Sequence, residues 1–474
     1  MEKEEKRGNK EFRKSSIVTF INGAASAGAM LITLSYISYI FTDLAHVELS
    51  MMSLGMSICS IAGLIFSLFF GMLIQKTRSR MGQYRPWLLV CTILVSGGTL
   101  LCVLEYTDPV LSFLMITLGY TISSMASDAQ MTALYGLLER FTGGESDKRN
   151  NIMATNVMGS NLGYLIWAAL LLPMVNVFGA EGGELTGFRG AEIIIAIAAI
   201  CGMLLMFFYS KKFDGDNRKT GGDDLGSVGV KEMLAGLFKN KPLLVVAIAE
   251  MIKYVGFYLF SYMMVYQCTY TLGSLDLMTW LLTGQSLICA LAAALSPLFA
   301  KWFKGRKRAV IALEIGCVVS YGVMAFTGGT IIGFIIPFVF ANIFEGAYMA
   351  FSINMYMDAG EWYYDKSGND TRTFAMSVQT IASKLGMMAS GIGLSMALVA
   401  CQYDEAIGAF GEAIGITTAE GMAMCTHLTG LLPAVATLLA ALVLIIFHHV
   451  KDSEMEACIA RNAEKDAALY GDMM

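Results

Sequence analysis

Long apolar stretches separated by short polar turns dominate the chain. A helix needs roughly 20 apolar residues to cross a bilayer core of about 30 Å, and about twelve stretches reach that length. They lie near residues 17–43, 47–74, 86–107, 109–139, 151–178, 187–210, 240–271, 276–300, 308–328, 329–357, 373–402 and 424–449. The pattern predicts an all-α membrane protein with twelve transmembrane helices.

A polar segment in the middle of the chain divides the stretches into two sets of six. Each set carries a short basic turn at a matching position, in Gly71–Leu89 and in Ser296–Leu313. Two pseudo-symmetric six-helix halves are the architecture of the major facilitator fold. The expected parts are an N-terminal bundle 1–210, a central cytoplasmic loop 211–239, a second bundle 240–449 and a cytoplasmic tail 450–474.

The distribution of charge gives an independent test of this topology. The expected topology places 30 of the 33 basic residues in the loops and termini on the same side of the membrane as the N-terminus. The exceptions are Arg189, in a loop on the other side, and Lys253 and Lys384, inside spans. Lys and Arg are retained preferentially on the cytoplasmic side, so we expect both termini in the cytoplasm and a multi-pass protein of the inner membrane. The basic turns then serve orientation in the lipid bilayer and do not indicate nucleic acid. The hydrophilic start shows no cleavable signal peptide.

Five ionisable residues deep inside the predicted spans are the candidates for a central site: Asp128, Glu250, Lys253, Glu345 and Lys384. A charge inside the bilayer costs several kcal/mol unless it faces a partner or a watery cavity. At 1.5 Å per residue all five lie roughly 14–20 Å from the cytoplasmic ends of their helices. That depth is where alternating-access transporters bind solutes and coupling ions.

The five charges allow different roles. Glu250 and Lys253 are three residues apart, so they can neutralise one another on one helix face, or they can form a coupling site together with Glu345. For Glu345, a structural hydrogen bond to another helix also remains open. Asp128 and Lys384 have no oppositely charged neighbour one helical turn away, so we expect them in a cavity, paired with one another or with a ligand.

Polar and aromatic residues extend the candidate solute site. Asn161, Asn342 and Gln379 bring amides into the spans, and Trp167 offers a flat face on which a sugar ring can stack. Amides in a helix bundle also serve as links between helices, and this alternative stays open for each of them. The ten cysteines form no CxxC motif or Cys/His cluster, so no metal site and no cofactor are expected.

Three separated motifs resemble the glycoside-pentoside-hexuronide:cation symporters, the group of the melibiose permease. They are TRSRMGQYRPWLL (Thr77–Leu89), DAGEW (Asp358–Trp362) and SVQTIASKLG (Ser377–Gly386). The resemblance implies that Lys384 lies beside the cation and sugar sites and that Asp128 binds sugar. It also implies that Asp358, Glu361, Arg372 and Arg149 form cytoplasmic gating ion pairs.

The sequence departs from the family at the cation site. The carboxylate pair that in the family holds sodium or a proton aligns with Gly63 and Ser67, and three of the four family sugar contacts align with Ala27, Thr132 and Asn156. Sodium prefers several oxygen ligands including carboxylates, so a proton is favoured over sodium as the coupling ion. Uniport without a coupled ion remains an alternative.

These observations predict a secondary transporter that moves a small organic solute, a sugar or a glycoside, by alternating access, with proton-coupled symport as one mode. The alternative solute is an aglycone or a lipid-like molecule on the same scaffold. A membrane-embedded enzyme is disfavoured because the chain has no phosphate-binding loop and no HExxH motif. We expect a monomer whose partners are the solute and the lipid bilayer.

Overall fold

The structure is a computed structural model of the 474-residue chain. It describes residues 2–142, 146–215, 238–303, 305–368, 372–404, 409–410, 418–450, 454–455 and 457–462. Most of the expected central loop 211–239 and most of the expected tail 450–474 lie outside the described residues.

The chain divides into two compact units, each described here by itself. Unit 1 contains Met1–Gly222, Met264–Leu287 and Leu398–Gly421. Unit 2 contains Asp223–Met263, Ile288–Ala397 and Met422–Met474. Unit 1 therefore combines the N-terminal half of the sequence with two short segments from the second half.

The first helix of unit 1 is interrupted, where the sequence predicts one span over 17–43. It runs as α1 (Glu2–Ser26), η1 (Ala27–Met30), α2 (Leu31–Ser35), α3 (Ile37–Tyr39) and η2 (Ile40–Leu44). Gly28 lies in the tighter turn η1, and a Cβ there would lie 2.7 Å from the Trp167 ring. The missing side chain therefore lets Trp167 pack directly on this break.

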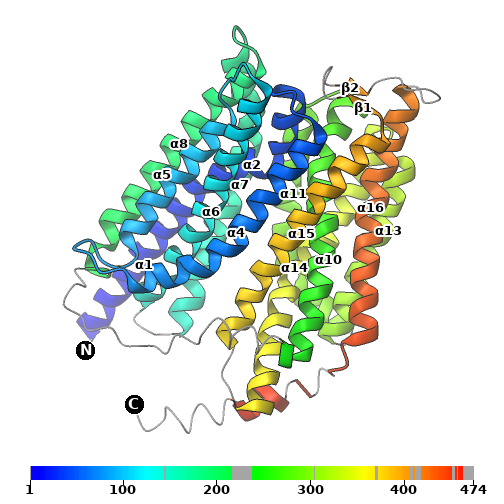
Figure 1. The fold of residues 1–474 in the computed structure, drawn as a ribbon. Helices are drawn as coiled ribbons and strands as arrows, with labels where there is room; N and C mark the ends of the chain where they lie inside the picture. The colour runs from blue at the N-terminus through cyan, green and yellow to red at the C-terminus, as the bar shows by residue number, and fades with distance from the viewer. Residues whose placement is uncertain are drawn as a thin grey trace. The chain divides into compact units, whose positions relative to one another are not determined.

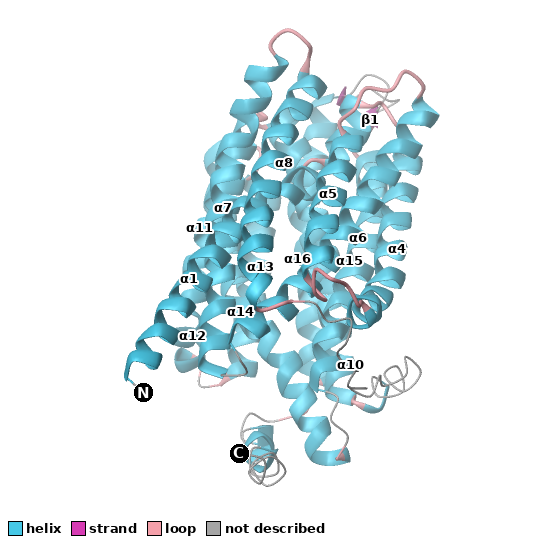
Figure 2. Cartoon of the chain, turned by 90° about the vertical axis from the view of Figure 1, so that its left-hand side faces the viewer, coloured by secondary structure: helices cyan, strands magenta, loops and turns pink. Residues whose placement is uncertain are grey.

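The other helices of unit 1 carry the apolar stretches of the first half (Figure 1). They are α4 (Leu49–Lys76), α5 (Arg85–Cys102), α6 (Pro109–Thr142), α7 (Ser146–Gly179), α8 (Glu184–Tyr209) and the short η3 (Ser210–Lys212). Helix α1 runs alongside α7 (Figure 2), where a Cβ at Gly163 would lie 2.2 Å from the Ala24 carbonyl oxygen. Such close backbone approach at small residues is typical of helix pairs in membranes.

Unit 2 is built from the helices of the second half. They are α10 (Lys241–Tyr266) with η4 (Gln267–Thr271), α11 (Asp276–Ala294), α12 (Ser296–Trp302), α13 (Arg306–Thr327), α14 (Ile331–Ser367), α15 (Arg372–Ala400) and α16 (Thr418–Phe447). Of these, η4, the larger part of α11 up to Leu287, and short ends of α10, α15 and α16 belong to unit 1. One buried apolar cluster takes side chains from α10, α13, α14, α15 and α16. It surrounds the charged residues described below.

The predicted span 276–300 is divided into two helices. The first ends at Ala294, Leu295 precedes α12, and Pro297 lies at the first turn of α12. Proline lacks the amide hydrogen that a continuing helix would use, and it is favoured in a first turn, so the break falls at this position. A two-stranded antiparallel hairpin, β1 (Tyr403–Asp404) and β2 (Ala409–Phe410), follows α15 and belongs to unit 1.

Within the described residues, 11 helices are long and apolar enough to cross a membrane, and a shorter apolar helix covers Asp276–Ala292. Many large apolar side chains on these helices are exposed, among them Val177, Phe208, Trp280, Phe326 and Ile332. An apolar surface of this extent fits lipid and not water. The prediction of a helical, multi-pass membrane protein is confirmed, while the count of twelve stays a prediction.

Candidate functional site

A small cavity lies inside unit 2, between α10, α14 and α15. Its volume is about 70 Å³, which is room for a few ordered water molecules. It is lined by Glu250, Lys253, Tyr254, Phe257, Glu345, Tyr348, Met349, Ser352, Ile353 and Gln379. Three of the five charged residues expected at mid-depth therefore meet at one cavity.

Lys253 and Glu345 form a buried ion pair across α10 and α14. The Lys253 Nζ lies 2.8 Å from the Glu345 carboxylate, and the two side chains are only 5% and 6% exposed. The ammonium also lies 3.1 Å from the centroid of the Tyr348 ring, and the Cys317 thiol donates to the same carboxylate at 3.6 Å. A desolvated cation is stabilised by an aromatic face as well as by an opposite charge.

Glu250 lies on the same face of α10 but is bonded differently. The hydroxyls of Ser352 and Tyr348 donate to its Oε1, the latter at 3.4 Å, whereas its Oε2 has no hydrogen-bond partner. The sequence left open an ion pair between Glu250 and Lys253 on one helix face. In the structure Lys253 instead forms its ion pair with Glu345. Glu250 is thus a buried carboxylate with spare bonding capacity on a cavity wall.

Glu314 on α13 is a fourth member of the cluster that the sequence reasoning missed. Its side chain is fully buried and neither carboxylate oxygen has a hydrogen-bond partner. It lies one helical turn before Cys317, whose thiol donates to the Glu345 carboxylate at 3.6 Å. The signal was available, because Glu314 interrupts the apolar run AVIALEIGCVV (Ala309–Val319), but it lies only about 12 Å from the start of α13 and so outside the mid-depth zone.

Aromatic residues line one side of α10 at every fourth position. Tyr254, Tyr258 and Tyr262 stack along the helix with ring centroids 5.9 Å and 6.2 Å apart. The hydroxyls of Tyr258 and of Ser383 on α15 are 2.9 Å apart. Spacing by four residues places side chains on one helix face, so the sequence itself predicts this aromatic row.

The other predicted solute residues are distributed over both units. Asn342 is buried, and its amide donates to the Phe338 carbonyl one turn earlier on α14. Trp167 donates to the Ala24 carbonyl at 3.1 Å, and Asn161 is exposed on α7. Asn342 and Trp167 therefore contribute contacts within their own units.

Asp128 and Lys384 lie in different units. Asp128 is half-buried on α6 of unit 1, and Lys384 is half-buried on α15 of unit 2. Their expected mutual attraction stays a prediction. Gln379, one turn before Lys384, lines the cavity of unit 2.

The predicted cytoplasmic gating residues lie at the end of α14 and the starts of α7 and α15. Glu361 accepts from the Asn462 amide at 2.6 Å, and Asp358 is half-buried on the same helix. The side chains of Arg149 and Arg372 lie outside the described part of the chain. Their predicted ion pairs stay a prediction.

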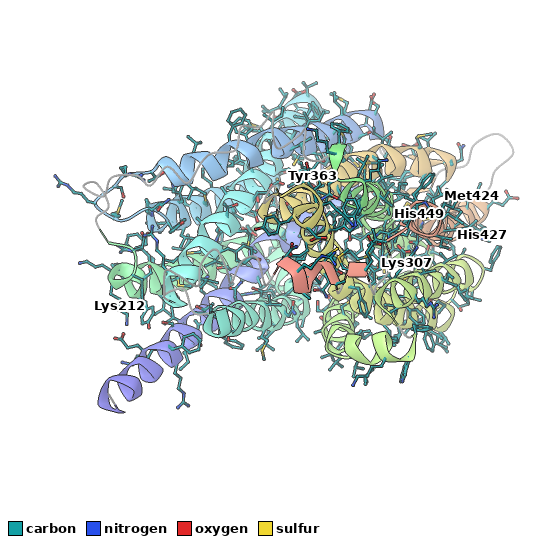
Figure 3. The ribbon with its side chains drawn as sticks, turned by 90° about the horizontal axis from the view of Figure 1, so that it is seen from below. Lys212, Lys307, Tyr363, Met424, His427 and His449 are labelled. Atoms are coloured by element: carbon teal, nitrogen blue, oxygen red, sulfur yellow. The ribbon has the colours of Figure 1, made fainter. Side chains whose placement is uncertain are left out.

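The basic turn between α4 and α5 is organised by Asp214, after η3. Its carboxylate accepts from the backbone amides of Gln83, Tyr84 and Arg85 at 2.8–3.0 Å and pairs with Arg140. Lys212 nearby pairs with Glu11 at 3.1 Å (Figure 3). The motif at Thr77–Leu89 therefore anchors an end of unit 1, and its carboxylate partner comes from the expected central loop.

At the opposite end of unit 1, segments from both halves of the sequence are bonded together. Tyr270 of η4 donates to Asp43 of η2, and the hydroxyls of Thr42 and Tyr266 are 2.7 Å apart. The hairpin packs Tyr403 against the Tyr266 ring, with centroids 5.3 Å apart. Among the described residues, no group of three or more His, Cys, Asp or Glu side chains could hold a metal ion.

Comparison with solved structures and characterised proteins places the chain among transporters. The structure matches the nucleoside transporter NupG with a TM-score of 0.63 at 15% identity over 93% of this chain and 100% of that chain. It matches a bacterial homologue of the human lysosomal transporter Spinster with a TM-score of 0.64 at 12% identity over 93% and 97%. These likenesses concern the fold.

Sequence relatives agree with this assignment. The isoprimeverose transporter of Lactiplantibacillus pentosus is 24% identical over 78% of this chain and 76% of that protein. The inner membrane symporter YicJ of Escherichia coli is 22% identical over 86% and 85%. The resemblance to glycoside-pentoside-hexuronide symporters is thereby confirmed. Because the model of the family described as MFS/sugar transport protein matches residues 19–450, the chain belongs to that family and is a membrane transporter, not an enzyme.

Proposed function

We propose that the protein carries a sugar or a glycoside across the inner membrane by alternating access, in symport with a proton. The relatives named for isoprimeverose, raffinose and lactose support the solute class. The coupling ion is argued from the side chains of this chain, because Gly63 and Ser67 stand where the resembling family holds its cation.

One observation carries the proposal: a cavity wall that combines ionisable groups, an amide and aromatic rings. Glu250 and Gln379 supply oxygen and nitrogen atoms for sugar hydroxyls, and Tyr254 and Phe257 supply flat faces. Binding sites for small molecules combine apolar and aromatic walls with a few convergent polar groups in this way. Glu250, Lys253 and Glu345 are the coupling residues in this proposal.

The remaining solute residues of the proposal belong either to unit 1 or to unit 2. Asp128, Lys384, Asn161, Trp167 and Asn342 are assigned to the solute path, as the resemblance and their place in the spans suggest. Asp358, Glu361, Arg372 and Arg149 are assigned to the cytoplasmic gate, since ion pairs that form in one state only can close one side of a carrier.

The topology of the proposal is twelve helices in two pseudo-symmetric halves with both termini in the cytoplasm. The basic turns support this orientation, and the split of α11 from α12 is compatible with one discontinuous span. The protein acts as a monomer in the lipid bilayer and uses no cofactor or metal ion.

The test is transport by purified protein in liposomes. Counterflow of radiolabelled lactose, raffinose and isoprimeverose measures carrier activity without net coupling. An imposed pH gradient of one unit, acidic outside, drives at most about tenfold accumulation for one proton per solute. We expect accumulation under the pH gradient, none under a sodium gradient, and saturable counterflow for at least one of the three sugars.

A matched pair of variants locates the coupling. Glu250→Gln should keep counterflow but lose accumulation, because the amide has the same shape and cannot bind the proton. Glu48→Gln makes the same chemical change at an exposed carboxylate and should behave as the parent protein.

Other outcomes would identify the alternatives. Counterflow without accumulation means uniport. Absence of counterflow with all three sugars, together with uptake of an aglycone, means a non-sugar solute, which the apolar lining residues Phe257, Met349 and Ile353 favour.

A further inference from the structure

Glu314 stands out as a buried acid outside the cavity. It does not line the cavity, its side chain is fully buried, and both oxygens lack a hydrogen-bond partner. Its neighbours along α13, Val310 and Leu313, belong to a buried apolar cluster that also takes Leu444 from α16. An ionised carboxylate left alone in such surroundings costs several kcal/mol, so Glu314 holds a proton in this state.

The charge count of the cluster requires bound protons. Three buried carboxylates, Glu250, Glu314 and Glu345, belong to a cluster with one buried ammonium, that of Lys253. Lys253 forms its ion pair with Glu345 at 2.8 Å, and no described ion pair includes Glu250 or Glu314. On α16, His427 bonds to the Ala325 carbonyl near the far end of α13. His427 therefore lies along α13 away from Glu314, and Lys253 is the cation of the cluster.

We propose that Glu314 is a second proton-binding site, to which the Lys253 ammonium moves when Glu345 takes up a proton. A proton from the cavity neutralises the Glu345 carboxylate and frees the ammonium. The ammonium then pairs with Glu314, whose carboxyl group releases its proton to water at the end of α13 that begins at Arg306. One proton enters at Glu345 and one leaves at Glu314, so the charge of the cluster stays constant.

The position of Glu314 along α13 suits release of its proton at the end of the helix that begins at Arg306. It lies two turns from Lys307, whose ammonium donates to the His448 carbonyl at the same end of α13 (Figure 3). Lys253 has a flexible four-carbon side chain, which permits it to exchange partners. The inference rests on the proposed proton coupling and adds the group that completes the proton path.

Infrared spectroscopy of the purified protein tests the switch without any solute. The parent protein should show the C=O stretch of a protonated carboxylic acid that disappears in Glu314→Gln. Glu345→Gln imitates the protonated Glu345, so the same band should disappear there as well, because Lys253 then ionises Glu314. Persistence of the Glu314 band in Glu345→Gln would overturn the exchange of partners, and its absence from the parent protein would overturn the bound proton.

Glu192 on α8 provides the matched control. It is also fully buried with both oxygens unpartnered, but it belongs to unit 1, whereas the cluster belongs to unit 2. Glu192→Gln should remove its own band, leave the Glu314 band, and keep coupling.

Transport separates this inference from the proposed function. With the sugar that gives counterflow among lactose, raffinose and isoprimeverose, Glu314→Gln should keep counterflow and lose the roughly tenfold accumulation under a one-unit pH gradient. Accumulation by the parent protein and equally by Glu314→Gln overturns the relay alone, whereas no accumulation by the parent protein overturns the coupling itself and the relay with it. If Glu314→Gln does not fold, Glu314→Asp, which retains an acid, must accumulate the sugar, and a folded Glu314→Asp with counterflow but no accumulation refutes the site.

Discussion

Replacing Lys253 by methionine removes the ammonium and keeps most of the volume of the side chain. Glu345 then loses its partner at 2.8 Å in surroundings where both side chains are almost fully buried. Breaking a buried ion pair by removing one partner costs about 3–5 kcal/mol, because the remaining charge stays desolvated. The contact of the ammonium with the Tyr348 ring is lost as well.

The assay is thermal unfolding of the purified protein in detergent. A loss of 3–5 kcal/mol corresponds to a fall of roughly 3–5 °C in the unfolding midpoint for a chain of this size. The double variant Lys253→Met with Glu345→Gln should regain most of the lost unfolding temperature, because both charges of the pair are then removed and no unpaired charge stays buried. Glu345→Gln alone should lower the unfolding midpoint less than Lys253→Met does, because Glu314 can then pair with the ammonium of Lys253.

An exposed ion pair gives the control. The Lys212 ammonium and the Glu11 carboxylate lie 3.1 Å apart, and their side chains are 40% and 54% exposed. Glu11→Gln should therefore cost less than about 1 kcal/mol. If the two changes at Lys253 and Glu345 simply add in the double variant, the buried pair has no coupling energy and the reasoning fails.

Three further predictions concern unit 1. Asp214→Ala should lower stability by about 3 kcal/mol in thermal unfolding, because three backbone amides lose a charged acceptor. Gly82→Ala should cost more than about 1 kcal/mol, since φ is +97° and a Cβ would lie 2.5 Å from Asp214, whereas Gly97→Ala, with no atom within 4 Å, should be neutral or stabilising. Tyr270→Phe should raise amide hydrogen exchange over η2 and η4 roughly tenfold, because a hydroxyl that donates to the Asp43 carboxylate is lost; unchanged exchange would mean that this bond does not close the end of unit 1.

The sequence predicts the helical, membrane-spanning fold because the length of an apolar run is a direct physical requirement of the bilayer. It does not predict where a span breaks. The turn at Gly28 depends on Trp167, more than a hundred residues away, and no local pattern encodes that contact. The break before Pro297 is different, because proline acts locally and its effect can be read from the sequence.

In the candidate site, too, the spacing along one helix is predicted by the sequence, whereas the contacts between helices are not. The helical periodicity places Glu250 and Lys253 on one face of α10, but the partner of Lys253 is chosen by α14, which brings Glu345 and Tyr348 together. Glu314 was missed because depth in the helix was used to choose candidates. Burial is decided by the neighbouring helices, and these enclose Glu314 at a depth where water would otherwise reach it.

The residue that binds the proton determines which solute contacts can be coupled to proton binding. By linkage, a proton that raises the affinity for the solute is itself bound more tightly, by the same factor, when the solute is bound. A proton at Glu345 changes the charge of the cavity wall formed by Glu250, Lys253 and Gln379, so it can be coupled to a solute that touches this wall. A solute held only by Asp128 and its neighbours in unit 1 would have no direct contact with the titrating groups. In the proposed mechanism, in which Gly63 and Ser67 leave no carboxylate for a cation, sugar recognition therefore depends on α10 and α15 as much as on the N-terminal helices.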